Sequence, residues 1–244
     1  MSRNKLIYGT HSILEALDAG KEIDKIFIRR GLKTDETQQV ARIARERVIP
    51  MQYVPSEKLD RLTTKNHQGI VAFIAEIEYT SLEQLIPIIY EEGRAPFFVI
   101  LDGITDVRNF GAIARTAECT GVDAIIIPDK GSVSVTGDAI KTSAGALHRV
   151  AVCRVSSISH TIRMLQDNGI KVVTASEKAN TTYTEESLQY PCAIVMGSEE
   201  VGPSEDTIRL SDSLIRIPQV GSIGSLNVSV AAGVILYECM IQNI

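Results

Sequence analysis

The feature that most constrains the fold is a series of short, continuously apolar segments in the second part of the chain. Six of them end at turn residues, at 97–103, 124–128, 150–155, 171–176, 192–197 and 214–218. Helical patterns lie between them, around 109–120, 138–147, 157–168, 204–210 and 227–242. Strands that are apolar on both faces and alternate with helices indicate a parallel sheet covered on both sides. Ligands of such sheets bind beyond the carboxyl ends of the strands. We therefore expect a site in the loops after Gly103, Gly197 and Pro218.

The first part of the chain predicts a separate, smaller α/β domain. Strand patterns occupy 24–30, 52–54 and 69–75, and helical patterns occupy 35–48 and 56–62. A block of about 75 residues with this character is large enough for a small domain.

A connecting segment over 79–96 joins the two parts. Thr80 and Glu83 fit a capping box, and Pro87 is expected to interrupt the helix that follows. The predicted organisation is a domain over 1–76, a linker with a short helix over 77–95, and a second domain over 96–244.

Composition excludes several classes of protein. The 244 residues are 44% hydrophobic, and no stretch approaches the roughly 20 apolar residues that a membrane span needs. The N-terminal sequence lacks the apolar core of a secretory signal. Four cysteines without a CxxC pair indicate reduced core thiols in a cytoplasmic protein, with no metal site.

The charge is unevenly distributed along the chain. Residues 1–75 carry a net charge of +4 and the remainder carries −9. A basic first part is typical of contact with a polyanion, although chance segregation of so few charges gives the same picture.

The first candidate loop lies at 101–128. Asn109 is expected to cap the helix that follows, and Gly111 to permit close approach of another backbone. Arg115 stands among apolar residues on a helix that otherwise has a buried pattern. A buried guanidinium must be paired or must contact an anion. A structural arginine satisfied by backbone carbonyls and an anion-binding arginine explain the pattern equally well.

The second and third loops lie at 194–210 and 214–234. In the second, Glu199 and Glu200 follow a strand between glycines, which favours a shaped, ligand-accepting loop over a solvated turn. In the third, Ser225 and Asn227 precede a run of small and apolar residues, where they are expected either to cap a helix or to face a ligand.

Two common nucleotide-binding motifs are absent from the sequence. No strand is followed by G-x-G-x-x-G or by G-x-x-x-x-G-K-[ST], which argues against a dinucleotide dehydrogenase and a phosphate-loop NTPase.

Taken together, three segments resemble the motifs of the SpoU, or TrmH, family of RNA 2′-O-ribose methyltransferases in the SPOUT superfamily. They are N-F-G-A-I-A-R at 109–115, M-G-S-E-E-V-G-P-S at 196–204 and the stretch from I-P to S-L-N-V-S-V-A-A-G at 217–233. Two further segments, at 7–17 and 67–72, resemble the substrate-binding N-domain of the same family. Glu200 departs from the pattern, because the family more often has glycine there, and position favours Glu199 as the acting carboxylate.

The resemblance implies a fold and a cofactor. The second domain would be a SPOUT-type parallel sheet with a C-terminal trefoil knot, and the first an L30e-like α/β domain that contacts RNA, with Arg29, Arg30 and Lys33 among its basic residues. S-adenosylmethionine would be bound by Met196, Gly197, Ile217 and Leu226. The protein would be a homodimer with its active site near the interface, where the small residues of 229–233 lie.

The resemblance also implies a reaction, the 2′-O-methylation of a ribose, most closely that of a guanosine in 23S ribosomal RNA. The catalytic residues would be Asn109, Arg115, Glu199, Ser225 and Asn227. A guanidinium holds its proton up to a pKa above roughly 12, so Arg115 acts either as an unusual general base or by stabilising the forming alkoxide. Two alternatives remain open: a methyltransferase acting on transfer RNA, and a non-catalytic RNA-binding protein of the same fold.

Overall fold

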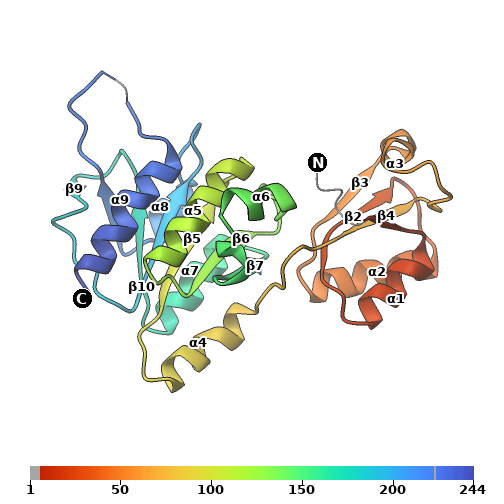
Figure 1. Cartoon of the computed structure of the whole chain (residues 1–244), viewed down its shortest axis with the longest axis horizontal. Coiled ribbons are helices and arrows are strands. Elements are labelled where there is room, and N and C mark those ends of the chain that lie inside the picture. The colour runs from red at the N-terminus through yellow and green to blue at the C-terminus, as the bar shows by residue number, and fades with distance from the viewer. Residues whose placement is uncertain (1–5, 223) are drawn as a thin grey trace. The chain divides into compact units, whose positions relative to one another are not determined.

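A computed structural model describes residues 6–222 and 224–244 of the chain (Figure 1). The chain divides into two compact units. The first holds the described residues up to Glu78 together with Ser134–Asp138, and the second holds Tyr79–Val133 and Ala139–Ile244. Within the described residues, no helix is both long and apolar enough to cross a membrane.

The first unit is a four-stranded sheet with the strand order β1-β4-β2-β3. The strands are β1 (Leu6–Tyr8), β2 (Ile23–Arg29), β3 (Met51–Val54) and β4 (Ile70–Ile74). β2 and β3 are parallel, and the other two pairs are antiparallel. Helices α1 (Thr10–Asp18) and α2 (Asp35–Glu46) bury apolar residues against one face. The short helix α3 (Ser56–Leu62) packs on the other face through Leu59.

The patterns predicted for this unit are confirmed, except that β1 and α1 were not expected from periodicity. β1 has only three residues, too few to display an alternation. α1 follows Gly9, which makes no side-chain capping bond, so the usual polar start signal of a helix is missing.

The second unit is built on a seven-stranded parallel sheet with the order β7-β6-β5-β10-β8-β11-β9. Its strands are β5 (Phe97–Asp102), β6 (Ala124–Pro128), β7 (Ala151–Val155), β8 (Lys171–Ala175), β9 (Thr181–Thr182), β10 (Cys192–Gly197) and β11 (Ser213–Arg216). The six apolar segments are therefore strands of one parallel sheet, as predicted. Only the two-residue edge strand β9 is additional.

Helices cover both faces of this sheet, which confirms the second part of the prediction (Figure 1). α4 (Leu82–Glu91) and α7 (Ile158–Asp167) share a core with one face. α5 (Val107–Cys119) and α9 (Val228–Ile241) pack against each other on the opposite face. The remaining helices are α6 (Gly137–Thr142), a 3-10 turn at Ala146–His148 and α8 (Glu205–Leu210).

The expected interruption at Pro87 was wrong, because α4 runs through this residue. Proline in a helix interior removes one hydrogen bond and crowds the preceding turn. Leu82, Ile86 and Ile89 are buried against the sheet, and this packing holds the helix together on both sides of the proline. The predicted cap was also one residue early: Ser81, not Thr80, accepts a hydrogen bond from the Gln84 amide at 3.3 Å.

The cap of α5 likewise differs from the expectation. Asp106 is the N-cap, and its carboxylate accepts hydrogen bonds from the amides of Arg108 and Asn109 at 2.8 and 2.9 Å. Asn109 therefore lies in the first turn with its side chain available for other contacts. The close approach expected at Gly111 is confirmed, since a Cβ there would lie 2.7 Å from Cβ of Thr142.

Candidate active site

A cavity of about 340 Å³ lies at the carboxyl ends of β8, β10 and β11. It is lined by residues 175–178 at the end of β8, by residues 196–203 at the end of β10, and by Ile215, Arg216, Ile217 and Gln219 at the end of β11. The start of α9 closes it with Val228, Ala231 and Ile235. This position agrees with the general rule for parallel sheets.

The structure gathers one part of the predicted site around this cavity. The four residues predicted to bind a cofactor, Met196, Gly197, Ile217 and Leu226, all line it, together with Glu199 and Ser225. Asn109, Arg115 and Asn227 do not line it. The predicted residues thus form two groups, one that lines the cavity and one that lies outside its lining.

Gly197 allows the loop after β10 to turn back sharply. A Cβ on this residue would lie 2.0 Å from the backbone nitrogen of Pro203 and 2.2 Å from the carbonyl carbon of Gly202. Both atoms belong to backbone, so no side-chain movement could relieve the overlap. Ser198 and Gly202 close the turn with two backbone hydrogen bonds, of 3.2 and 2.9 Å. Glu199 and Glu200 stand at its tip.

Asp102, at the end of β5, anchors the far end of the same loop. Its Oδ2 accepts hydrogen bonds from the Ser204 amide at 2.9 Å and from Oγ1 of Thr207 at 2.7 Å. Ser204 is the N-cap of α8, and the acidic residues Glu205 and Asp206 lie in its first turn. The loop that carries Glu199 is thereby tied to the strand that precedes α5.

Asn227 joins the three predicted motifs. Its Nδ2 donates hydrogen bonds to Oδ1 of Asn109 at 3.0 Å and to Oε1 of Glu199. Its Oδ1 accepts from the backbone amide of Ser229 at 3.0 Å and from the hydroxyl of that residue at 2.5 Å. The same carboxylate oxygen of Glu199 accepts from the Val228 amide at 3.3 Å. Asn227 is therefore both the N-cap of α9, one of the two predicted roles, and the link between α5 and the loop after β10.

The two adjacent glutamates have different surroundings. Glu199 points to the start of α9, where it accepts a side-chain and a backbone hydrogen bond. Glu200 has no hydrogen bond or ion pair to the part of the chain that the structure describes. The geometry thus separates two carboxylates that sequence position alone distinguished weakly.

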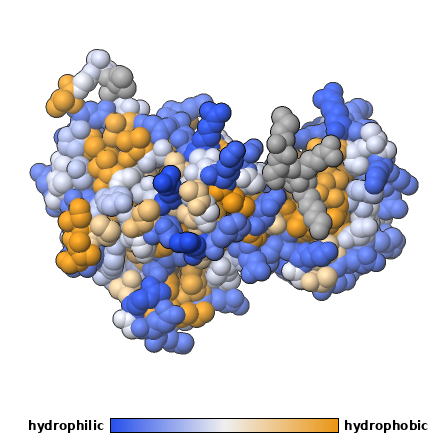
Figure 2. Space-filling model, in the orientation of Figure 1, coloured by the Kyte–Doolittle hydropathy of each residue, from blue (hydrophilic) through white to orange (hydrophobic). Residues whose placement is uncertain are grey.

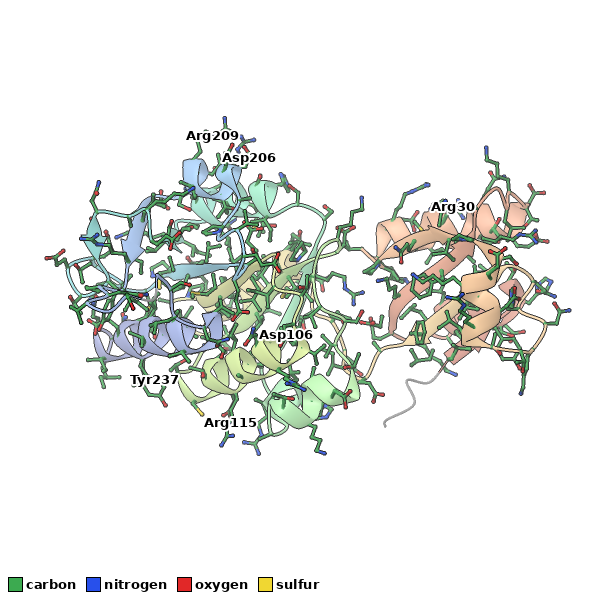
Figure 3. The ribbon with its side chains drawn as sticks, turned by 90° about the horizontal axis from the view of Figure 1, so that it is seen from above. Arg30, Asp106, Arg115, Asp206, Arg209 and Tyr237 are labelled. Atoms are coloured by element: carbon green, nitrogen blue, oxygen red, sulfur yellow. The ribbon has the colours of Figure 1, made fainter. Side chains whose placement is uncertain are left out.

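Arg115 is exposed, so the expectation of a buried guanidinium was wrong. Phe110, Ile113, Ala114 and Ala117 form the inner face of α5, and the helical repeat turns Arg115 to the other side. Figure 3 shows its side chain pointing outward, on the same side of the unit as Tyr237 of α9. Within residues 6–222 and 224–244 its guanidinium makes no hydrogen bond or ion pair.

Sequence reasoning missed the loop after β8. Ser176, Glu177 and Lys178 line the cavity although none of them was a candidate. The signal was present, because 171–176 was already predicted as a strand of the parallel sheet, and its carboxyl end belongs to the same edge as the others. The anchoring role of Asp102 left no comparable trace in the sequence.

The expectation that all four cysteines lie in the core was wrong for one of them. Cys119 is exposed, whereas Cys153, Cys192 and Cys239 are buried. Sγ of Cys192 and Sγ of Cys239 lie 3.4 Å apart, and this contact together with burial raises the pKa of Cys239. No group of three or more His, Cys, Asp or Glu suited to a metal ion occurs among the described residues.

Comparison with known proteins identifies the family. A model described as the SpoU rRNA Methylase family matches residues 96–237, and one described as RNA 2'-O ribose methyltransferase substrate binding matches residues 6–80. The chain belongs to the SpoU/TrmH family of RNA methyltransferases. A relative from Staphylococcus haemolyticus, named as a TrmH family tRNA/rRNA methyltransferase, is 39% identical over 96% of this chain and 94% of its own.

Two solved structures show the same fold. An AdoMet-bound rRNA methyltransferase from Sinorhizobium meliloti superposes with a TM-score of 0.62 and 24% identity, covering 98% of this chain and 87% of that one. A TrmH/SpoU tRNA modifying enzyme from A. aeolicus has a TM-score of 0.55 and 27% identity, covering 66% of this chain and 83% of that one. In this SpoU chain, the three motif segments meet where Asn227 contacts Asn109 and Glu199.

Proposed function

We propose that this protein transfers a methyl group from S-adenosylmethionine to the 2′-hydroxyl of a ribose in RNA, and that its substrate is a guanosine of 23S ribosomal RNA. The observation that carries the proposal is the convergence of the three family motifs through the hydrogen bonds of Asn227 to Asn109 and to Glu199, of which Glu199 lines the cavity. A fold retained without a reaction would not require these polar side chains to meet beside a cavity. This supports an enzyme over a non-catalytic RNA-binding protein.

The cavity fits the proposed cofactor. Its volume of about 340 Å³ lies in the range of small-molecule sites. Met196, Ile217 and Leu226 supply apolar surface for an adenosine, and the tight turn at Gly197 exposes backbone groups for its polar edge. When bound, S-adenosylmethionine supplies an electrophilic methyl group on a sulfonium. All other chemistry falls to the chain's own residues.

The polar cluster is suited to positioning. The amide of Asn227 is engaged on both sides, so its orientation is fixed. It holds Glu199 in the lining of the cavity, to which Ser225 and Leu226 also belong. We infer that Glu199, Asn109 and Asn227 hold the ribose and the loop in line with the methyl group. Correct alignment supplies a large part of the acceleration of such a transfer, on the order of 7–11 kcal/mol in favourable cases.

We infer that Arg115 stabilises the negative charge that forms on the ribose oxygen while the proton of that hydroxyl passes to solvent and the methyl group moves from the sulfonium to the oxygen. A guanidinium donates several hydrogen bonds and keeps its proton, which suits an electrostatic role better than that of a base. Its outward direction from α5 places it away from the cavity wall of its own protomer (Figure 3). It therefore acts at the site of a second copy in this proposal.

A homodimer explains the surface of α9. Val228, Ala232, Ile235, Leu236 and Cys239 form the buried stripe of this helix. The opposite stripe is also apolar, with Val230, Tyr237 and Ile241 exposed by 52, 45 and 56%. Figure 2 shows apolar residues at the surface near the C-terminal end of the chain. A helix that is apolar all round is normally buried.

Among the small residues at 229–233, Gly233 has no close neighbour on the side where a Cβ would point. A Cβ at Gly233 would meet no atom within 4 Å. Because Gly233 lies on the exposed stripe, we propose that α9 and α5 of a second copy cover it. This arrangement would place two active sites near one interface.

We also propose a C-terminal knot, an L30e-like first domain and the bounds of both domains. The parallel sheet and the family match support a C-terminal trefoil knot, and the mixed sheet with α1 and α2 on one face supports an L30e-like first domain. We propose domains over 1–76 and 96–244 with a linker over 77–95. We also propose a cytoplasmic location, which agrees with a ribosomal RNA substrate.

Ribosomal RNA is favoured over transfer RNA by the extent of the likeness. The tRNA modifying enzyme from A. aeolicus matches only 66% of this chain, whereas the rRNA methyltransferase from Sinorhizobium meliloti matches 98%. A full substrate-binding unit is therefore shared with the ribosomal enzyme. Transfer RNA is the second candidate, because the named relative is described for both substrates.

The decisive experiment uses RNA that lacks the modification. The protein is incubated with labelled S-adenosylmethionine and total RNA from a strain without it, and the labelled ribose is mapped. We expect label in 23S ribosomal RNA at one guanosine 2′-oxygen. Label in transfer RNA would show that the substrate is transfer RNA and not ribosomal RNA. No label in any RNA would overturn the proposed activity.

A further inference from the structure

We propose that the face of the first unit's sheet opposite α1 and α2 binds a single-stranded segment of the RNA that flanks the methylated nucleotide. The inference rests on the proposed function and concerns a surface distant in sequence from the three motifs. It assigns a binding role to Tyr8, Phe73, Lys25, Lys58 and Lys65.

Cross-strand pairing places apolar and aromatic side chains in two rows on this face. Leu6, Phe73 and Lys25 pair across β1, β4 and β2 in one row. Tyr8, Val71 and Phe27 pair across the same strands in the next row. The rings of Phe27 and Phe73 contact each other edge to face, with centroids 5.9 Å apart. The sheet therefore presents aromatic rings in neighbouring rows.

Three lysines reach over these rings. Nζ of Lys58 lies 4.7 Å from the centroid of Phe27, and Nζ of Lys25 lies 5.4 Å from it. Nζ of Lys65 lies 5.7 Å from the centroid of Tyr8. An ammonium group at this distance is attracted by the ring face but keeps donors free for an anion. The rings thus hold positive charge at the rim of an apolar surface.

The coverage of the two faces differs. α1 and α2 fill the opposite face with a continuous core, whereas among the described residues only α3 packs on this one. α3 covers Phe27, Val54 and Val71 with Leu59. Tyr8 and Phe73 are only partly buried, so α3 leaves both residues incompletely covered.

Aromatic rings bordered by lysines match the chemistry of unpaired nucleotides. A base stacks on an aromatic side chain, and its phosphate takes the neighbouring ammonium groups. In a duplex the bases already stack on one another and are not free for this contact. An acidic protein segment would satisfy the lysines but would leave the half-buried rings without a stacking partner. Of the two acidic residues of α3, Asp60 is bound to Nε2 of His67 at 2.9 Å, and Glu57 lies in the first turn of the helix.

The test measures binding of the full chain to a fluorescein-labelled single-stranded RNA of about a dozen nucleotides, a length that spans one binding surface of this kind. Two variants separate stacking from charge. Phe73→Leu keeps an apolar side chain against α3 and removes the ring, and we expect it to weaken binding about tenfold. Replacing Lys25, Lys58 and Lys65 together by Gln should lower the salt dependence, reducing the slope of log K against log salt by about 2.

A matched control removes the same charge from elsewhere in the unit. Lys21, Arg42 and Arg45 are exposed on the side covered by helices, and replacing all three by Gln should leave the affinity for this RNA within about twofold. Thermal unfolding of each variant confirms that the fold is retained. Affinities of the Phe73 and lysine variants equal to that of the control would overturn the inference, as would equally tight binding of a duplex of the same sequence.

Failure of this inference is distinguishable from failure of the proposed function. Variants that bind RNA like the unmodified protein while ribose methylation continues would contradict only the binding face. Weakened binding in these variants, in a protein that methylates no RNA, would support the binding face and contradict the methyltransferase.

Discussion

The side-chain amide of Asn227 donates a hydrogen bond to Oδ1 of Asn109 across 3.0 Å, although the two residues are 118 positions apart in the chain. The bond connects the first turn of α5 to the start of α9. Because the same amide caps α9 through its oxygen, the structural and the proposed catalytic roles are carried by opposite ends of one group.

Asn227→Ala should separate these two roles. Loss of the cap is expected to lower the free energy of unfolding by about 1 kcal/mol, and loss of the link to Glu199 should lower methyl transfer per folded molecule by at least about tenfold. Ser157→Ala is the matched control, because Ser157 caps α7 in the same way. Denaturant unfolding and single-turnover methylation measure the two effects. Equal turnover in both variants would show that Asn227 is a cap alone.

Glu199→Gln and Glu200→Gln should behave differently. Glu199 accepts hydrogen bonds at the start of α9, and hydrogen bonds to a charged group are worth about 1.5–3 kcal/mol. We expect methyl transfer to fall by roughly tenfold to a hundredfold in Glu199→Gln and to remain within about twofold in Glu200→Gln. Steady-state methylation with calorimetric measurement of S-adenosylmethionine binding checks this. The reverse order would assign the role to Glu200.

Arg115→Ala should abolish methyl transfer and leave S-adenosylmethionine binding intact, because the residue lies outside the cavity. If Arg115 acts at the partner's site, mixing subunits of Arg115→Ala with subunits of Asn227→Ala restores one complete site in each mixed dimer. The expected activity of such a mixture is about a quarter of the unmodified level, since statistical pairing makes half of the dimers mixed. A mixture as inactive as its components would place Arg115 at the site of its own protomer.

Tyr237→Glu should convert the proposed dimer to a monomer. The substitution puts a charge in the middle of the exposed apolar stripe of α9, where covering it would cost several kcal/mol. Ile88→Glu is the control, because Ile88 is exposed by 50% on α4, away from that stripe. Light scattering after size-exclusion chromatography measures the mass. A dimer in the Tyr237 variant would place the interface elsewhere.

Alkaline pH should destabilise the protein through its buried thiols. Burial, with a smaller contribution from the charge of Glu83, raises the pKa of Cys153 to about 12. The unfolded chain releases this proton near pH 8.5 whereas the folded one retains it, so stability falls as pH rises from about 8.5 towards 12. The slope from Cys153 alone is about 1.4 kcal/mol per pH unit within that window.

Cys153→Ala tests the origin of this slope. Unfolding in denaturant at pH 7.5 and at about pH 10 should show a smaller loss of stability in the variant than in the unmodified protein. An unchanged slope would assign the alkaline effect to other groups, such as Tyr190, whose pKa burial also raises.

The sequence predicts the architecture of the second unit well because its signals are local. The apolar segments at 97–103 and 192–197 are buried on both faces, so their composition alone identifies them as inner strands of a parallel sheet. Pro87 shows where local signals fail. Its helix survives because of buried contacts that only the folded sheet supplies.

In the candidate site, too, some residues can be predicted from local sequence signals and others cannot. Gly197 and Asn227 carry local signals, a glycine after a strand and a polar residue before a helix. The exposure of Arg115 depends on how α5 packs, and the anchoring by Asp102 depends on contacts more than a hundred positions away along the chain. Neither can be obtained from spacing, since both arise from the tertiary arrangement.

The turn after β10 has one further consequence, which concerns the entropy of binding. Its shape is closed by Ser198 and Gly202 and admits only glycine at position 197. A loop that is ordered before its ligand arrives loses little conformational freedom when the ligand binds. Binding of a cofactor in this cavity therefore carries a smaller entropic cost, and the same contacts give a higher affinity than they would with a loop that becomes ordered only on binding.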